Sequence, residues 1–209
     1  ELLNNNDVEQ YNIEKIVIWS CQKTLDGIEE KPWLIKLHEP VMEHSYLHRA
    51  IWQYKKLNFR LKDEKCDILF VPGGVFATDF KPVVTMSQNL IPFKINEILR
   101  YGVSLLTIKF ILLRLFQSRS LKKSNGSVFL TEFAKDSVLK VTGPLNGTNT
   151  VISHGIEKVF VQSHGLQKEI NLYSKENPFQ LLYVSTIEPY KHHHQVIDAV
   201  TMVRAEGFP

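Results

Sequence analysis

The sequence predicts an α/β protein in which short buried strands alternate with helices. Three observations support this fold class. Apolar runs rich in β-branched and aromatic residues recur along the chain between polar loops, as is typical of strands. Between several of these runs, apolar residues recur every three or four positions, which is the period of a helix. Hydrophobic residues make up 44% of the 209 positions, which is enough for a globular core.

The first half of the chain contains four predicted strands and one clear helix. The strands are, in order, residues 15–20, 33–37, 66–71 and 81–86. Residues 45–62 predict a helix, and its expected buried face consists of Leu47, Ile51, Tyr54, Leu57 and Leu61. Gly73 and Gly74 follow the third strand. Glycines at a strand end let a ligand approach the backbone closely, although they also form plain tight turns.

The second half repeats the alternation. Residues 127–131 and 150–153 are predicted strands, and residues 132–141 form the helix between them. Residues 181–184 predict another buried strand, which leads through a polar loop into a second helix. The apolar face of that helix consists of Val196, Ile197, Val200 and Val203.

These elements suggest two domains. We expect the first at residues 1–165, a polar linker at 166–178, and the start of a second domain at 179–209. One strand and one helix cannot bury a core of their own. We therefore expect the sequence to be a fragment, cut at both ends.

The net charge of the chain limits the classes of partner that it is expected to bind. A net charge of +3 and a pI near 8.7 are mild, and no dense Lys/Arg blocks alternate with aromatic residues, so we expect no nucleic-acid partner. An anionic small molecule or an anionic membrane surface fits better. Cys21 and Cys66 lack the spacing of a metal or redox motif, and no secretory signal is recognisable. We therefore expect reduced thiols and a cytoplasmic location.

Residues 102–116 are unusual because they combine ten large apolar residues with two charges, Lys109 and Arg114. The run is shorter than the roughly 20 residues needed to span a bilayer. Two interpretations stay open. The segment is either a core helix of the first domain or a helix that lies on the cytoplasmic face of a membrane. In the second case its basic residues would face anionic lipid: Arg100, Lys109, Arg114, Arg119, Lys122 and Lys123.

Lys191 stands where the strand at 181–184 is expected to feed a helix. At such a junction, free backbone N–H groups and the helix macrodipole favour an anion. A charge-assisted contact of about 1.5–3 kcal/mol plus a dipole term of about 0.3–1 kcal/mol would change phosphate affinity by about a hundredfold. The alternative is an ordinary solvated lysine in the first turn.

The sequence around this lysine resembles retaining glycosyltransferases of the GT-B fold, the large family 4. In that family an Arg and a Lys, five positions apart after the first strand of the second domain, hold the donor diphosphate. Thr186 and Lys191 have this spacing. Residues 128–160 also resemble a run of the family, with these residues at the expected places: Glu132, Ala134, Lys135, Val151, Ile152, Gly155, Ile156 and Phe160.

The resemblance implies two Rossmann-like domains and assigns roles to matching positions. Lys191, Thr186 and Ser185 would bind the donor phosphates. Gln88 and Asn89 would stand at the catalytic position near the reacting sugar. His154 and Gly155 would line the acceptor side of the cleft, and we assign Gly73 and Gly74 to the same side because they follow a strand end.

Five positions depart from the family pattern. Gln88 replaces a His, Thr186 an Arg, Ser185 a Gly, His154 an Asn and Glu157 an Asp. A Gln side chain orients a hydroxyl but cannot take its proton. This fits a retaining mechanism in which the donor phosphate receives the proton, and it also fits a protein that has lost activity.

The implied activity is transfer of a hexose-type sugar, with retention, from a nucleotide-sugar donor to a hydroxyl of a lipid-linked or saccharide acceptor. Cell-surface polysaccharide or glycolipid synthesis would be its setting. No cofactor and no metal are expected, since consecutive residues of the run 192–194 (three His) point in different directions on a helix. This stretch alone is expected to be inactive. The alternatives are a non-catalytic nucleotide-sugar-binding or scaffolding module and, less favoured, a nucleotide-sugar epimerase.

Overall fold

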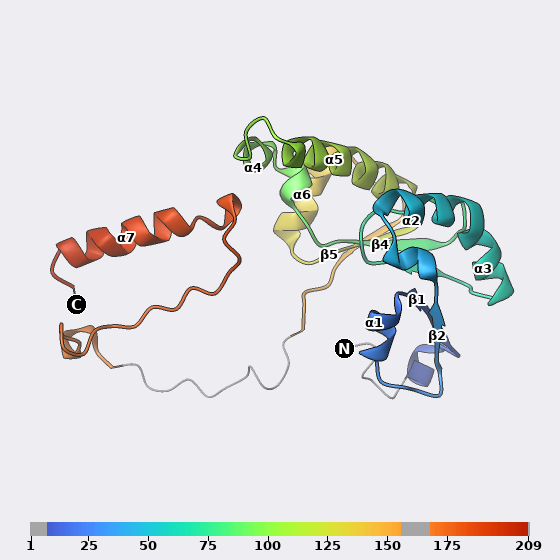
Figure 1. The fold of residues 1–209 in the computed structure, drawn as a ribbon, viewed down its shortest axis with the longest axis horizontal. Helices are drawn as coiled ribbons and strands as arrows, with labels where there is room; N and C mark the ends of the chain where they lie inside the picture. Colours follow the sequence, from blue (N-terminus) through green and yellow to red (C-terminus); the bar gives the residue numbers. More distant parts are fainter. Residues whose placement is uncertain (1–7, 156–167, 209) are drawn as a thin grey trace. The chain divides into compact units, whose positions relative to one another are not determined.

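A computed structural model describes residues 8–155 and 168–208 of the chain (Figure 1). It consists of two compact units. The first comprises Glu1–Phe93 and Leu112–Gly155, and the second comprises Lys94–Ile111 and Ile156–Pro209. Each unit is described by itself below.

A four-stranded parallel sheet organises the first unit. Its strands, in sheet order, are β3 (Leu69–Val71), β4 (Val83–Ser87), β5 (Gly126–Phe129) and β6 (Thr148–Val151). All four overlap predicted strands, β6 only at residues 150 and 151. The α/β fold class is therefore confirmed, and the parallel sheet is compatible with a Rossmann-like architecture.

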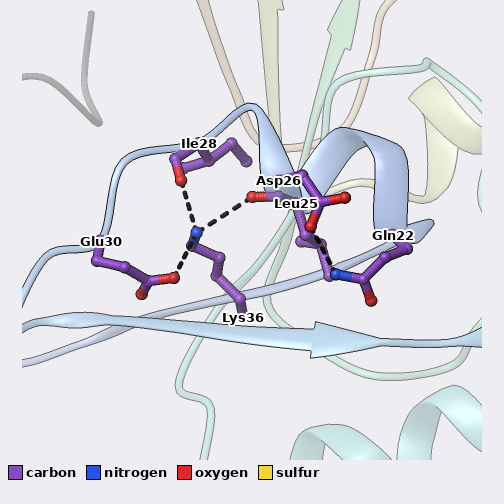
Figure 2. A network of polar contacts seen from close by, with 6 residues as sticks. All are labelled: Gln22, Leu25, Asp26, Ile28, Glu30 and Lys36. Atoms are coloured by element: carbon purple, nitrogen blue, oxygen red, sulfur yellow. Dashed lines mark hydrogen bonds and ion pairs between the residues drawn. The ribbon is translucent and has the colours of Figure 1, made fainter.

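A second, two-stranded parallel sheet pairs β1 (Ile16–Ser20) with β2 (Leu34–His38), again as predicted. The short helix α1 (Gln22–Asp26) connects the two strands. Figure 2 shows how Lys36 of β2 supports this connection. Its Nζ donates to the carbonyl oxygens of Leu25 and Ile28 at 3.1 and 2.5 Å and lies 2.7 Å from Glu30 Oε1. The ammonium thus ties the end of α1 and the turn that follows it to β2.

The predicted helix at 45–62 forms, but a π-helical turn interrupts it. The regular parts are α2 (Tyr46–Trp52) and α3 (Asn58–Asp63), and the π turn covers Gln53–Leu57. A π turn holds an extra residue per turn, so the side chains after it rotate relative to those before it. This rotation changes which side chains reach the core.

The predicted buried face of this helix is therefore only half correct. Leu57 and Leu61 are buried, and Trp52 joins them five positions before Leu57. The other three predicted residues are exposed by 68%, 47% and 70%: Leu47, Ile51 and Tyr54. A regular 3.6-residue period cannot predict the five-residue step from 52 to 57.

Two apolar clusters form the core of the first unit. The first packs the helix against the sheet and contains Trp52, Leu57, Leu61, Leu69 and Val83. The second contains Phe93, Leu121, Phe129 and Val138. Phe129 and Val138 belong to β5 and to α6 (Glu132–Thr142), the helix predicted at 132–141. Burial of each large side chain contributes about 1.5–3 kcal/mol, so these clusters hold the sheet against its helices.

The apolar segment at 102–116 lies mostly in α5 (Leu105–Lys123), which follows the short α4 (Ile95–Leu99). The prediction of a core helix is wrong for this segment. Between residues 105 and 116 no side chain is buried, whereas the buried residues of α5 all lie further on, at Gln117, Ser120 and Leu121. No described helix is long and apolar enough to cross a membrane.

In the second unit, the predicted buried strand at 181–184 does not form. These four residues are in irregular backbone and pair with no strand among the described residues, and Leu182 and Val184 are exposed by 88% and 80%. A parallel strand needs neighbours for its backbone N–H and C=O groups. The predicted helix does form, as α7 (His193–Ala205), but Ile197 and Val203 on its apolar face are exposed. Short 3-10 turns complete the chain: Val8–Tyr11, Pro40–Glu43, Ile91–Phe93, Ile170–Leu172 and Pro189–Lys191.

Candidate functional site

The carboxyl edge of the four-stranded sheet carries the predicted acceptor-side residues. Because β3, β4, β5 and β6 are all parallel, their carboxyl ends lie along one edge, where open α/β sheets bind ligands. The loops that leave this edge contain, in order, Gly73 and Gly74, Gln88 and Asn89, Thr131, and His154 and Gly155. The topology thus brings together six residues selected from the sequence.

The two glycines at this edge have different roles. Gly74 is buried, with φ +73°, and a Cβ there would stand 3.2 Å from the Met86 carbonyl oxygen and 3.4 Å from Gln117 Nε2. Both the backbone angle and the close approach therefore require glycine. Gly73 is exposed, and a Cβ there would meet nothing within 4 Å. Gly73 consequently offers open backbone for a ligand, while Gly74 fixes the turn.

Gln117 is a residue at this site that the sequence analysis missed. Its side chain is buried beside Gly74, at 9% exposure, and Oε1 has no hydrogen-bond partner among the described residues. A buried acceptor without a partner costs about 1–3 kcal/mol. The sequence offered no signal for Gln117 beyond the amide itself, which Phe116 and Ser118 flank.

Gln88 and Asn89 follow β4, and they differ in how firmly they are held. Asn89 Oδ1 accepts a hydrogen bond from the backbone N–H of Ile91 at 3.0 Å, so this side chain starts the turn at Ile91–Phe93. Gln88 is exposed, and its Nε2 donates at 3.3 Å to the Met86 sulfur, a weak acceptor. Gln88 is therefore the residue of the two that is available to a ligand.

The loops after β5 and β6 complete the edge. Thr131 caps α6 by accepting a hydrogen bond from the backbone N–H of Ala134 at 3.0 Å. Glu132 occupies the first turn of α6 and pairs with Lys135 at 3.1 Å. Its carboxylate already interacts with the positive end of the helix dipole. His154 and Gly155 are exposed after β6. In the part of the chain that the structure describes, this half of the edge offers an imidazole, backbone groups and Lys135, whose charge Glu132 already pairs.

The predicted donor-phosphate residues lie in the second unit, just before α7. Lys191 ends the turn Pro189–Lys191, and His192, with φ +57°, connects it to the helix. Lys191 O accepts from the Tyr183 hydroxyl at 2.6 Å, and Lys191 Nζ stands 5.1 Å from the centre of the Tyr190 ring. The lysine therefore lies beside a helix amino terminus, as predicted, although the preceding strand is missing.

The other two predicted phosphate ligands lie in the same loop. Ser185 Oγ donates to the carbonyl oxygen of Thr186 at 3.1 Å, and the Thr186 side chain is exposed. Glu188, between Thr186 and Lys191, accepts a hydrogen bond from the Tyr101 hydroxyl at 3.2 Å. Partial burial and the Glu188 carboxylate raise the pKa of Tyr101. The negative charge of Glu188 repels an anion. The loop therefore binds phosphate less strongly than a loop that carried Lys191 without a nearby carboxylate.

Metal-ligand geometry does not appear in the described ranges, 8–155 and 168–208, where no three His, Cys, Asp or Glu side chains are grouped to hold an ion. Cys21 and Cys66 are free thiols. The chemistry that the described side chains offer is therefore hydrogen bonding at the sheet edge and a lysine at the start of α7.

Comparison with family models, with curated proteins and with solved structures finds no match to this chain. The fold alone defines its class. It is an α/β protein with a parallel sheet whose carboxyl edge carries glycine, amide and histidine side chains.

Proposed function

We propose that the chain forms the acceptor-side domain and part of the donor side of a retaining GT-B glycosyltransferase of family 4. Such an enzyme would move a sugar from a nucleotide-sugar donor to a hydroxyl of a saccharide or lipid-linked acceptor. The observation that carries the proposal is the common edge of the parallel sheet. Two motifs of the resemblance, at residues 88–89 and 154–155, and the paired glycines at 73–74 follow three strands that end at that edge.

The donor side of the proposal depends on Lys191. Its position before α7, a helix of 13 residues whose N-cap makes no side-chain hydrogen bond, leaves backbone N–H groups for a diphosphate. Thr186 would add an uncharged hydroxyl contact, which is weaker than the Arg of the family. We therefore expect donor binding to depend more on Lys191 than on any other side chain of this loop.

The acceptor side depends on Gln88, which is exposed after β4. In the proposed reaction the acceptor oxygen bonds to the anomeric carbon on the face that the diphosphate leaves, and a phosphate oxygen of the leaving group takes the acceptor proton. Gln88 would hold the acceptor hydroxyl in place. This needs no general base in the protein, which agrees with the Gln at this position.

A binding or scaffolding module of the same fold is the second candidate. It is favoured by Asn89, which is held in a turn, and by the lack of charge at Gln88 and Thr186. A nucleotide-sugar epimerase is a weaker third candidate. The module would bind a nucleotide sugar without transferring the sugar, so binding and transfer have to be measured separately.

The test of the donor site is calorimetric titration of the full-length protein with UDP-, GDP- and dTDP-sugars. Lys191→Ala should weaken binding of the preferred donor by ten- to a hundredfold, because it removes a charge-assisted contact. Lys175→Ala is the matched control, since Lys175 is an exposed lysine in the same unit, and it should leave affinity unchanged. Equal affinity of the Lys191→Ala variant and the unmodified protein would remove Lys191 from the site.

A further inference from the structure

The polarity of α5 is the reverse of that of an ordinary surface helix, which turns apolar side chains to the core and polar ones to water. Two of its three buried residues, Gln117 and Ser120, are polar. Its exposed side includes Leu105 at 85%, Leu115 at 61% and Phe116 at 53%. The helix therefore presents to solvent the kind of surface that helices normally bury.

Five exposed apolar side chains of α5 lie along one side of the helix, and we call them the α5 stripe. Its members are Leu105, Ile108, Leu112, Leu115 and Phe116, all exposed by 46% or more. Steps of three and four residues place them on a single side of the helix. A continuous apolar stripe of this length marks an interaction surface rather than scattered exposed residues.

The charge of this region indicates what covers the stripe. Residues 94–123 contain seven Lys and Arg but only one acid, Glu97, which pairs with Arg100 at 2.9 Å. The segment is thus net +6, while the whole chain is +3, so the remaining residues together are net −3. The positive charge of the protein is concentrated where the apolar stripe lies.

Several of these cations are available to an external anion. Within the described ranges, Lys109, Arg119 and Lys122 have no ion-pair partner, and all three are exposed. Lys123 has only a distant partner, Asp79, at 3.9 Å. Lys109 lies among the residues of the stripe, and Arg119, Lys122 and Lys123 lie in the last two turns of α5, beyond it.

We propose that α5 docks on an anionic lipid membrane. The helix lies in the plane of the surface, with the α5 stripe in the boundary between head groups and acyl chains and the exposed cations against anionic head groups. Docking of this kind does not require a helix that crosses the membrane. The proposal stands independently of the glycosyltransferase proposal, although a lipid-linked acceptor would suit both.

Charge separates the membrane from two other occupants of the stripe. A second copy of the chain packed through the same surface would bring two +6 segments together, which costs affinity. Helix α7 of the same chain offers apolar side chains, but it carries only one acidic residue, Asp198, together with Arg204. An anionic lipid surface supplies both the apolar layer and the opposite charge.

Co-sedimentation of the full-length protein with vesicles tests this docking. Phosphatidylcholine vesicles with phosphatidylglycerol should bind the protein at 0.1 M salt, and phosphatidylcholine alone should not. Binding should fall at 1 M salt, because the screening length shortens from about 10 Å to about 3 Å. Each basic residue near an anionic surface contributes about a fivefold change in partitioning, so losing four should reduce binding by more than a hundredfold.

The charge variant replaces Lys109, Arg119, Lys122 and Lys123 with Gln. Its matched control replaces four exposed lysines elsewhere with Gln, at positions Lys55, Lys56, Lys62 and Lys140. The control keeps the same net charge as the charge variant, so it should retain most of the binding. Equal losses in both variants would show attraction by net charge alone and would overturn the assignment to α5.

A second variant tests the stripe itself. Leu112→Ser with Leu115→Ser leaves every charge in place and should still reduce vesicle binding by tenfold or more, with the far-ultraviolet circular dichroism spectrum unchanged. Binding to neither vesicle type, or to both equally, would contradict the proposal. A change from dimer to monomer in the serine variant, seen by sedimentation without lipid, would instead assign the stripe to a second copy.

Discussion

Two predicted strands have opposite fates in this molecule. Residues 126–129 form the central strand β5, and Phe129 is 0% exposed, whereas residues 181–184 form no strand and Leu182 is 88% exposed. β5 has β4 on one side and β6 on the other, while 181–184 has no strand partner among the described residues. The difference teaches that burial of such a run depends on its neighbours as much as on its own composition.

The largest effect we predict comes from truncating the two runs. Phe129→Ala should lower the free energy of unfolding by about 3–5 kcal/mol, because it leaves a cavity in a packed core. Leu182→Ala should change it by less than about 0.5 kcal/mol, as is usual for exposed positions. Urea unfolding followed by circular dichroism measures both. A cost for Leu182→Ala close to that for Phe129→Ala would mean that 181–184 is buried in solution.

The two glycines after β3 allow a buried and an exposed position to be compared within the first unit. Gly74→Ala should cost about 1–2 kcal/mol for the left-handed backbone angle alone, with more from the contact with the Met86 carbonyl oxygen at 3.2 Å. Gly73→Ala is the control and should be nearly neutral, since nothing lies within 4 Å of its Cβ position. The same urea titration compares them. Equal costs for the two variants would contradict the assigned roles.

Gln117 gives a smaller effect of opposite sign. Gln117→Leu removes a buried acceptor that has no partner in the described part of the chain, so it should stabilise the unliganded protein by about 1 kcal/mol. The melting temperature would rise accordingly. A lower melting temperature would show that the amide is already satisfied in the unliganded protein.

The smallest effect concerns the hydrogen bond between Tyr101 and Glu188 in the second unit. Tyr101 donates to Glu188, and its pKa is raised by partial burial and then by that carboxylate. Because the folded pKa lies above the unfolded value near ~10, the stabilisation is complete below that pH and is lost as pH rises through the folded pKa. Tyr101→Phe should remove this alkaline loss. Identical stability profiles of both proteins above pH ~10 would exclude a role for the contact.

Local signals were sufficient for much of the fold. Strands β1, β2 and β5 and helix α6 were predicted closely because their apolar runs are short, bounded by turns, and paired in the structure. The π turn at Gln53–Leu57, which changes the buried face of the helix, was not predictable, since no residue type marks a π turn. The exposed face of α5 and the absent strand at 181–184 depend on tertiary partners that a local pattern does not specify.

The candidate site was predictable in part. The sequence located Gly73, Gln88 and His154 at strand ends, and the parallel topology places them along one edge. The structural roles of Gly74 and Asn89 became visible only through their contacts with Met86 and Ile91. Gln117 was missed because no sequence pattern shows that a single glutamine within a helix is buried.

The most direct test of the central claim is sugar transfer by the full-length protein from UDP-, GDP- and dTDP-sugars in the presence of EDTA. The account predicts transfer to a saccharide or lipid-linked hydroxyl, with the anomeric configuration of the donor kept in the product, as read by NMR. It also predicts that Gln88→Ala reduces turnover more than donor affinity. Donor binding without transfer would assign the chain to the non-catalytic module. An inverted product or a strict requirement for a divalent metal would contradict the proposed retaining, metal-free reaction.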